Sequence, residues 1–212
     1  MIQLFQIIVL VFSAVIHEYM HGWMADRLGD DTAKRAGRLT LNPLVHLDMF
    51  GSIILPLLLI FSGVGVIFGW AKPVPYNPNN LRDSKWGSAK VAAAGPLGNL
   101  IIAVFFGIFL RVVPLGNPML IGLIAIIIFI NLILMIFNLV PIPPLDGSKI
   151  LMAFLPFSWQ LKFMRWEKYG MILVLLFLFV AIDLILPITL FLMKIIVGSQ
   201  AFMTISLMFG FG

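Results

Sequence analysis

Long apolar runs alternate with short charged segments along this chain. Asp, Glu, Lys and Arg are absent from residues 1–17, 49–71, 91–110, 112–145, 150–161, 169–182, 184–193 and 195–212. A helix that crosses a membrane needs about 20 predominantly apolar residues, and several of these runs reach that length. The pattern therefore predicts membrane helices at 3–28, 90–112, 119–139 and 168–186, with one or two more after Pro187.

Residues 50–69 form a sixth candidate, and their composition favours a bent path. Pro56, Gly63, Gly65 and Gly69 disfavour a straight helix. Basic residues stand on both sides of the stretch, so a spanning helix would carry one basic cluster to the outside, against the positive-inside tendency. We therefore expect 50–69 to dip into the membrane and return on the same side.

Two proline-rich segments interrupt the helical pattern. Residues 70–82 contain Pro73, Pro75 and Pro78, and residues 141–147 contain three more prolines directly after a long apolar helix. Because proline has no backbone N–H and ends helices, both segments are predicted to be loops or extended chain.

The composition excludes several classes of protein. Hydrophobic residues make up 61% of the chain and charged residues 11%, which excludes a disordered protein, a collagen-like fibre and an ordinary water-soluble enzyme. The absence of Cys excludes a disulfide scaffold, a Cys-ligated zinc site and an iron–sulfur protein. Lys and Arg exceed Asp and Glu by 14 to 9, but they lie between apolar runs, where they set membrane orientation, so we expect no nucleic-acid partner.

These patterns predict the fold class. We expect an α-helical polytopic membrane protein with about 5–6 transmembrane or re-entrant helical segments. It would form a single integral membrane domain over residues 1–212, with a core at about 1–150 and C-terminal helices at about 165–210.

The strongest chemical signal is the sequence His17-Glu18-Tyr19-Met20-His21. On a helix, residues four apart lie on one face, so both imidazoles can reach one metal ion. Glu18 can accept a proton from a water on that metal. Two hydrogen-bonded histidines at a polar helix end are the alternative. However, ionisable groups inside a membrane helix need a compensating partner, which one Zn²⁺ ion provides.

A catalytic zinc site has three protein ligands and leaves a fourth position to water, so one ligand is still missing. Asp146 stands out because it closes the uncharged stretch 112–145 and follows a proline-broken helix, which a membrane tolerates where it lines a cavity. Within its Asp-Gly pair it could equally be a turn residue. The other candidates are Asp26, Asp30, Asp31, His46, Asp48, Asp83, Glu167 and Asp183.

Two classes of function other than zinc-dependent catalysis could use the same residues. A transporter or ion permease could place His17, Glu18 and Asp146 along an ion pathway, although the chain lacks internal repeats and the H-E-x-x-H spacing is tight. A catalytically inactive scaffold could keep the fold, but the intact Glu18 argues against it.

The chain resembles the site-2 protease family of intramembrane zinc metalloproteases, in a short prokaryotic form without a PDZ domain. That family carries H-E-x-x-H on one helix and N-x-x-P-x-P-x-L-D-G on a later one, which residues 138–147 match at every fixed position. A third family feature, A-G-P-x-x-N, matches residues 94–99. The matches span residues 17–147, and the last 60 or so residues match no motif.

The resemblance implies roles at the matching positions. His17, His21 and Asp146 would ligate one zinc ion, and Glu18 would act as general base and then as proton donor. Asn138 would face the site and hydrogen-bond the substrate or the oxyanion, unless it only joins helices, and Asn131 on the same face fits either role. For Gly95 and Asn99 we expect simple packing against the metal-bearing helix.

Some neighbouring residues keep two interpretations. His46 and Asp48 could belong to a second metal site, but we expect a polar turn at the surface. Bond cleavage inside a membrane also requires the substrate helix to unwind, and an exposed edge strand could pair with it. Residues 64–76 or 36–42 are the candidates for this short membrane-associated β element.

The resemblance implies a transmembrane protein or peptide as substrate, such as an anti-sigma factor or a remnant signal peptide, in the bilayer of a prokaryotic cell membrane. With 50–69 re-entrant, helix 3–28 runs inward, 90–112 outward and 119–139 inward. All Lys and Arg residues except Arg111 and Lys194 then fall on the cytoplasmic side. The histidines and Asp146 would meet near the cytoplasmic leaflet.

Overall fold

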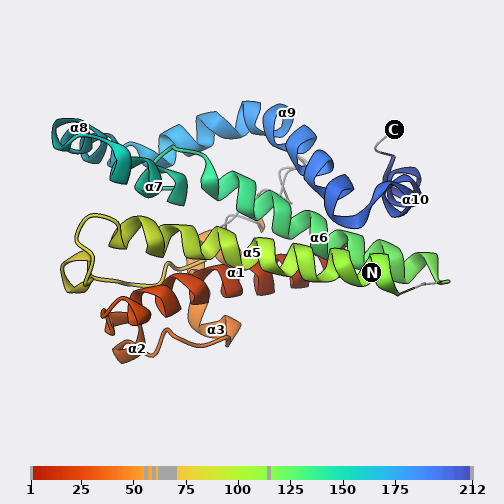
Figure 1. The fold of residues 1–212 in the computed structure, drawn as a ribbon, viewed down its shortest axis with the longest axis horizontal. Helices are drawn as coiled ribbons and strands as arrows, with labels where there is room; N and C mark the ends of the chain where they lie inside the picture. The colour runs from red at the N-terminus through yellow and green to blue at the C-terminus, as the bar shows by residue number, and fades with distance from the viewer. Residues whose placement is uncertain (1, 55–56, 59–60, 62–70, 114–115, 211–212) are drawn as a thin grey trace.

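The computed structural model of this chain is built from helices joined by short connections (Figure 1). It describes all residues except 1, 55–56, 59–60, 62–70, 114–115 and 211–212. The long helices are α1 (Ile2–Arg27), α5 (Gly87–Val112), α6 (Pro118–Leu139) and α9 (Gly170–Val197). The shorter elements are α2 (Thr32–Arg35), α3 (Pro43–His46), η1 (Met49–Ile54), η2 (Pro78–Asn80), α7 (Asp146–Phe154), α8 (Phe157–Glu167) and α10 (Ser199–Phe209).

Three of these helices, α1, α5 and α6, are long and apolar enough to cross a membrane. The two arms of α9, Gly170–Leu178 and Asp183–Val197, meet at 72° and make a fourth span if they are taken together. The chain is therefore an all-helical protein with three or four candidate spans among its described residues, where the sequence predicted about five or six segments.

The predicted helices at 3–28, 90–112 and 119–139 are confirmed as α1, α5 and α6. Helix α6 begins with Pro118 in its first turn, and the side chain of Asn117 caps it by accepting from the N–H of Met119 at 2.9 Å. The prediction that a helix ends at Pro187 is wrong, because α9 continues through this proline to Val197. A proline inside a helix removes one backbone hydrogen bond, but the 72° bend of α9 lies between Leu178 and Asp183, before Pro187.

Helices α1, α5 and α6 pack against one another and form the bundle that carries the site. Helices α1 and α6 run in the same direction, and α5 runs against both (Figure 1). As a result, the end of α1, the start of α5 and the end of α6 all lie at one end of the bundle.

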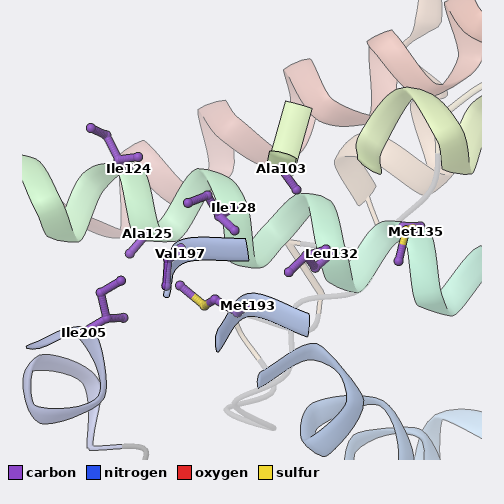
Figure 2. Packing of buried hydrophobic residues seen from close by; sticks show 9 residues of the cluster. All are labelled: Ala103, Ile124, Ala125, Ile128, Leu132, Met135, Met193, Val197 and Ile205. Atoms are coloured by element: carbon purple, nitrogen blue, oxygen red, sulfur yellow. The ribbon is translucent and has the colours of Figure 1, made fainter. Parts of the chain in front are cut away.

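A buried apolar cluster attaches the C-terminal helices to this bundle (Figure 2). Ile128 and Leu132 of α6 lie at its centre and have no exposed surface. The cluster consists of Ala103, Ile124, Ala125, Ile128, Leu132, Met135, Met193, Val197 and Ile205. One face of α6 is thereby buried against α9 and α10, and another face is left for α1 and α5.

The expected β element is not present in the described part of the chain. Residues 36–42 contain no strand, and residues 71–77 are extended without pairing to a neighbouring strand. Pro73 and Pro75 have no N–H to donate, so that edge of the segment cannot form a ladder. On the other edge, the N–H of Lys72 donates to His46 O and the N–H of Val74 donates to Glu18 Oε2, both at 2.8 Å. At the end of the segment, the N–H of Asn77 donates to Asp30 Oδ2 at 2.6 Å. Residues 64–70 of the prediction lie outside the described residues.

Described residues on either side of the stretch predicted to be re-entrant are in contact. The N–H of Lys72 donates to the carbonyl of His46 at 2.8 Å, so the two flanks of residues 47–71 touch. The first part of the stretch forms η1, and most of its further course lies outside the described residues. The contact between the flanks is what a re-entrant path requires.

Candidate metal centre

Three side chains from distant parts of the sequence converge at the end of the bundle. Nε2 of His17 is 3.0 Å from Oδ2 of Asp146, and Nε2 of His21 is 3.2 Å from the same oxygen. The ligand atoms of the three residues all lie within 4.8 Å of one another. His17 and Asp146 are buried, and His21 is half-buried.

The local sequence explains how each side chain reaches this point. His17 and His21 lie one helical turn apart on α1, so their rings project from the same face. Asp146 is the first residue of α7, and the proline-rich turn after α6 carries it back over the bundle. Gly147 makes this turn possible, because a Cβ at this position would lie 2.1 Å from the carbonyl oxygen of Leu139.

The second ring nitrogen of each histidine is held by a hydrogen-bond acceptor on α5. Nδ1 of His21 is 2.7 Å from the carbonyl oxygen of Val91, and Nδ1 of His17 is 2.7 Å from Oδ1 of Asn99. Each Nδ1 therefore donates, and the lone pair of each Nε2 is left facing Asp146. This is the arrangement that metal-binding histidines adopt.

The two helices meet along matching stripes of residues four apart. On α1 the stripe is Ser13, His17 and His21; on α5 it is Val91, Gly95 and Asn99. Gly95 lies against both imidazoles, and a Cβ there would lie 2.5 Å from Nε2 of His21 and 2.7 Å from Cε1 of His17. The packing role predicted for Gly95 is therefore confirmed, and it places α5 directly against the two rings.

This donor set fits a divalent metal ion. A tetrahedral zinc ion with bonds of about 2.0–2.1 Å holds its ligand atoms about 3.3 Å apart, and two of the separations here are 3.0 and 3.2 Å. Two imidazole nitrogens and one carboxylate oxygen form a ligand set that zinc accepts, and three protein ligands leave a fourth position open. His17, His21 and Asp146 could therefore hold the ion.

Glu18 lies beside this centre, and the chain fixes its carboxylate. Oε2 of Glu18 accepts a hydrogen bond of 2.8 Å from the backbone N–H of Val74. The side chain of Val74 is buried against α1, where its Cγ1 would be 3.0 Å from a Cβ at Gly22. The extended segment 72–77 thus passes over the end of α1 and orients the acidic group.

The other predicted ligand candidates do not join the three residues. Among the described residues, His17, His21 and Asp146 form the only group of this kind that could hold a metal ion. Asp83 instead pairs with Lys90 at 2.6 Å, which lowers the pKa of this half-buried carboxyl, and Asp31 pairs with Arg35 at 2.6 Å. The remaining candidates, Asp26, Asp30, Asp48, Glu167 and Asp183, belong to no such group within the described chain.

The expectation that His46 lies in a polar surface turn is wrong. Its side chain is 1% exposed, and its Nε2 is 2.8 Å from the carbonyl oxygen of Thr40. This contact closes the loop before α3, so that the carbonyl of His46 can accept from Lys72. Asp48 is half-buried and accepts from the N–H of Gly51 at 2.7 Å.

Asn99 is the site residue that sequence reasoning misjudged. Simple packing was expected, but its side chain contacts His17, and its position four residues after Gly95 on the same helical face was the available signal. Asn138 is half-buried at the end of α6, and its Nδ2 donates to the carbonyl of Leu134 in the same helix at 2.9 Å. Its role toward a substrate stays a prediction.

The geometry defines a candidate metal centre at one end of a bundle of apolar helices, and comparisons with known proteins give the class of the protein. Residues 115–181 match peptidase family M50. The chain is 42% identical to "Putative zinc metalloprotease YwhC" of Bacillus subtilis over 183 residues, which cover 82% of this chain and 79% of the relative. It is 30% identical to "Putative zinc metalloprotease Rip2" of Mycolicibacterium smegmatis over 169 residues, covering 79% and 64%.

A shorter similarity reaches an archaeal protein. "Putative zinc metalloprotease MJ0611" of Methanocaldococcus jannaschii is 40% identical over 75 residues, covering 35% of this chain and 38% of the relative. No solved structure matches the chain at a significant level. The extent of the similarity to the Bacillus protein settles the class: the chain belongs to peptidase family M50, the site-2 protease family of metalloproteases. It is accordingly a membrane metalloprotease, with a protein as its substrate.

Proposed function

We propose that this protein is an intramembrane zinc protease that hydrolyses a peptide bond in or near the transmembrane helix of a membrane-protein substrate. The observation that carries the proposal is the convergence of His17 and His21, on the candidate span α1, with Asp146 at the start of α7, all within 4.8 Å. The three side chains would ligate the ion. The zinc-protease names of the relatives support this choice of metal.

The bound zinc would polarise the scissile carbonyl and lower the pKa of the attacking water. Glu18 would accept the proton of that water as general base and then donate it to the leaving amine. Its second carboxylate oxygen is held by the N–H of Val74, so the base is oriented before substrate arrives. Asn138 would contribute a hydrogen bond to the substrate or to the developing oxyanion.

The position of the centre suggests where cleavage occurs. It lies at the end of the bundle where α1 and α6 finish, next to the basic connections that the positive-inside tendency assigns to the cytoplasm. A substrate helix would therefore be cut near the cytoplasmic leaflet. The substrate would be a single-span membrane protein, such as an anti-sigma factor or a remnant signal peptide.

Glu18→Gln separates proton transfer from metal binding. The variant should keep zinc and fold, but lose cleavage of a model transmembrane peptide by about 10²–10⁴-fold, because the amide cannot accept the proton. Zinc content and cleavage by the purified protein are measured together. Substantial cleavage by the variant would refute the mechanism.

Asp146→Ala separates the metal site from other uses of the same residues. It should lower zinc occupancy as strongly as His17→Ala, because each variant removes one of three protein ligands. Asp183→Ala changes an exposed carboxylate on α9 and serves as the control that keeps its zinc. Wild-type zinc affinity in Asp146→Ala would exclude it as a ligand, and a protein that moves ions without cleaving peptides would be a transporter instead.

A further inference from the structure

A buried polar network links His17 to all three helices of the bundle. Asn99 on α5 and Asn131 on α6 have no exposed surface, and Ser13 on α1 is buried as well. Besides its contact with His17, Asn99 donates through Nδ2 to Oδ1 of Asn131 at 2.9 Å and to the carbonyl of Ser13 at 3.2 Å. Asn131 donates through Nδ2 to Oγ of Ser13 and to the carbonyl of Ile127, both at 2.9 Å. We call these residues the Ser13–Asn99–Asn131 network.

Two backbone carbonyls fix the direction of every hydrogen bond in this network. The oxygen and nitrogen of an amide side chain can be exchanged by a flip, but a backbone carbonyl can only accept. The carbonyl of Ile127 therefore requires the NH₂ group of Asn131 on its side, which turns Oδ1 of Asn131 toward Asn99. The carbonyl of Ser13 independently requires the NH₂ group of Asn99, which turns Oδ1 of Asn99 toward His17.

This direction decides where the proton of His17 lies. Oδ1 of Asn99 has no hydrogen, so the 2.7 Å contact requires Nδ1 of His17 to be the donor. A neutral imidazole carries one proton, and with that proton on Nδ1 the lone pair lies on Nε2. Nε2 is the atom that faces Asp146 and the ligand atom of His21.

We propose that the Ser13–Asn99–Asn131 network is the positioning device that holds the proton of His17 on Nδ1 and so presents Nε2 to the metal. The proposal rests on the proposed function, because it treats His17 as a metal ligand. His21 obtains the same orientation from the carbonyl of Val91, which no side-chain substitution removes. The orientation of His17 depends on side chains and can therefore be tested by mutation.

A purely structural role makes a different prediction. Polar side chains between membrane helices also hold the helices together, and such a role would change stability without changing metal affinity. Thr189 offers a matched control, because it has no exposed surface, lies on the apolar helix α9, and donates to the carbonyl of Ile185 in its own helix at 2.8 Å. Thr189→Val removes a polar group that is as buried as Asn99 and Asn131 but has no hydrogen bond to His17.

The experiment measures the zinc affinity of the purified full chain by competition with a chelator, together with thermal unfolding. Asn99→Leu should weaken zinc binding by about 10–100-fold, the usual cost of losing the partner of a metal-bound histidine. Asn131→Leu should weaken it less. In the double variant, Asn131→Leu should add little, because its effect on His17 passes through Asn99. Thr189→Val should bind zinc like the wild type.

A second measurement needs no substitution. Nitrogen NMR of the protein labelled in its three histidines should show a proton on Nδ1 of His17 with and without zinc. A neutral His17 ring protonated on Nε2 alone would overturn the proposal. Because this measurement uses the wild type, it decides the matter even if Asn99→Leu fails to fold.

The remaining outcomes are equally distinct. Folded Asn99→Leu with wild-type zinc affinity would overturn the proposal, and independent, additive losses from the two asparagines would do so as well. If the wild type binds zinc but cleaves no peptide, the proposed protease function fails, while the zinc affinities and the NMR result still decide the role of the network.

Discussion

Gly95 occupies the narrowest point between α1 and α5. A Cβ at this position would lie 2.5 Å from Nε2 and from Cε1 of His21, far inside the distance at which carbon atoms can pack. Both rings therefore rest on the backbone of α5. Any side chain at residue 95 has to push a candidate ligand away from Asp146.

Gly95→Ala should accordingly weaken zinc binding by at least about tenfold, because the imidazoles must move off their hydrogen-bond partners. The control is Gly122→Ala, also inside a membrane helix, where the nearest atom to a new Cβ is Cζ of Phe209 at 3.9 Å. That variant should keep its zinc affinity and gain about 0.5–1 kcal/mol of stability, as Ala favours the helix over Gly. Chelator competition and thermal unfolding measure both quantities, and equal zinc affinity of the two variants would contradict the packing argument.

A substitution at Asn138 tests the proposed hydrogen bond to the substrate or the oxyanion. Asn138→Leu should retain zinc but lower turnover by about 10²-fold, because a donor aimed at the oxyanion acts only after the metal is bound. Its hydrogen bond to Leu134 lies within its own helix, so the substitution breaks no described side-chain hydrogen bond between helices. Loss of zinc or of folding would assign Asn138 to the structure of α6 instead. Steady-state kinetics with zinc analysis distinguish the two results.

At the scale of elements, Asp30 fastens the loop after α1 to the segment that leads into α5. Its side chain has no exposed surface and accepts hydrogen bonds from Thr32, from the backbone N–H of Asn77 and from the side chain of Asn80. Burial raises the pKa of the Asp30 carboxyl, but these hydrogen bonds outweigh burial and leave the pKa below its usual range. The same contacts hold segment 72–77 in the position from which Val74 reaches Glu18.

The lowered pKa of Asp30 makes the stability that its hydrogen bonds contribute depend on pH. Because the carboxyl binds its proton more weakly in the folded state than in the unfolded state, its contribution to stability is complete above its unfolded pKa of about 3.9 and disappears as the pH falls through the lower folded value. Asp30→Asn should cost about 1–3 kcal/mol of stability at pH 7, because an amide has one acceptor oxygen in place of two and cannot accept from all the donors around it.

The measurement is thermal unfolding of both proteins from pH 7 to pH 3, with hydrogen exchange of residues 77–82 as a local probe. The difference in stability between wild type and Asp30→Asn should begin to shrink as the pH falls below the unfolded pKa of about 3.9. A difference in stability that stays constant from pH 7 to pH 3 would contradict this role of the Asp30 carboxylate.

At the scale of the whole molecule, the direction of α1 and α6 decides whether a metal site can exist. Both helices run the same way (Figure 1), so their ends bring the histidines and Asp146 to one level. The flanks of residues 47–71 touch through His46 and Lys72, and the N–H of Arg82 donates to the carbonyl of Leu28 at 2.9 Å. These contacts place the connections before and after that stretch at the same end of the bundle.

Cysteine labelling tests this arrangement in a chain that has no native Cys. Arg35→Cys and Lys85→Cys alter exposed side chains, and both should be protected from a membrane-impermeant reagent added to intact cells. Gly116→Cys, exposed at the opposite end of α5, is the positive control that should be labelled. Labelling of only one of residues 35 and 85 would show that residues 50–69 cross the membrane.

The sequence by itself determined the membrane helices, the chemistry of H-E-x-x-H and the candidate third ligand. Apolar runs of fixed length and residues four apart on a helix are local properties, so α1, α5 and α6 and the pairing of His17 with His21 could be predicted from them. The relative direction of the helices also followed, because the placement of basic residues restricts the topology.

Only the tertiary structure decided how the histidines are oriented and what segment 72–77 does. An asparagine on an apolar helix can join helices, bind substrate or hold a ligand, and which of these occurs depends on the neighbour it meets. Asn99 meets Nδ1 of His17 because the register of α1 against α5 brings them together. The prolines at residues 73 and 75 likewise allowed either an edge strand or an extended segment that pairs with no strand. The structure shows the extended segment, which donates hydrogen bonds to His46, Glu18 and Asp30 elsewhere in the sequence. Contacts between distant residues depend on packing geometry, which no local pattern encodes.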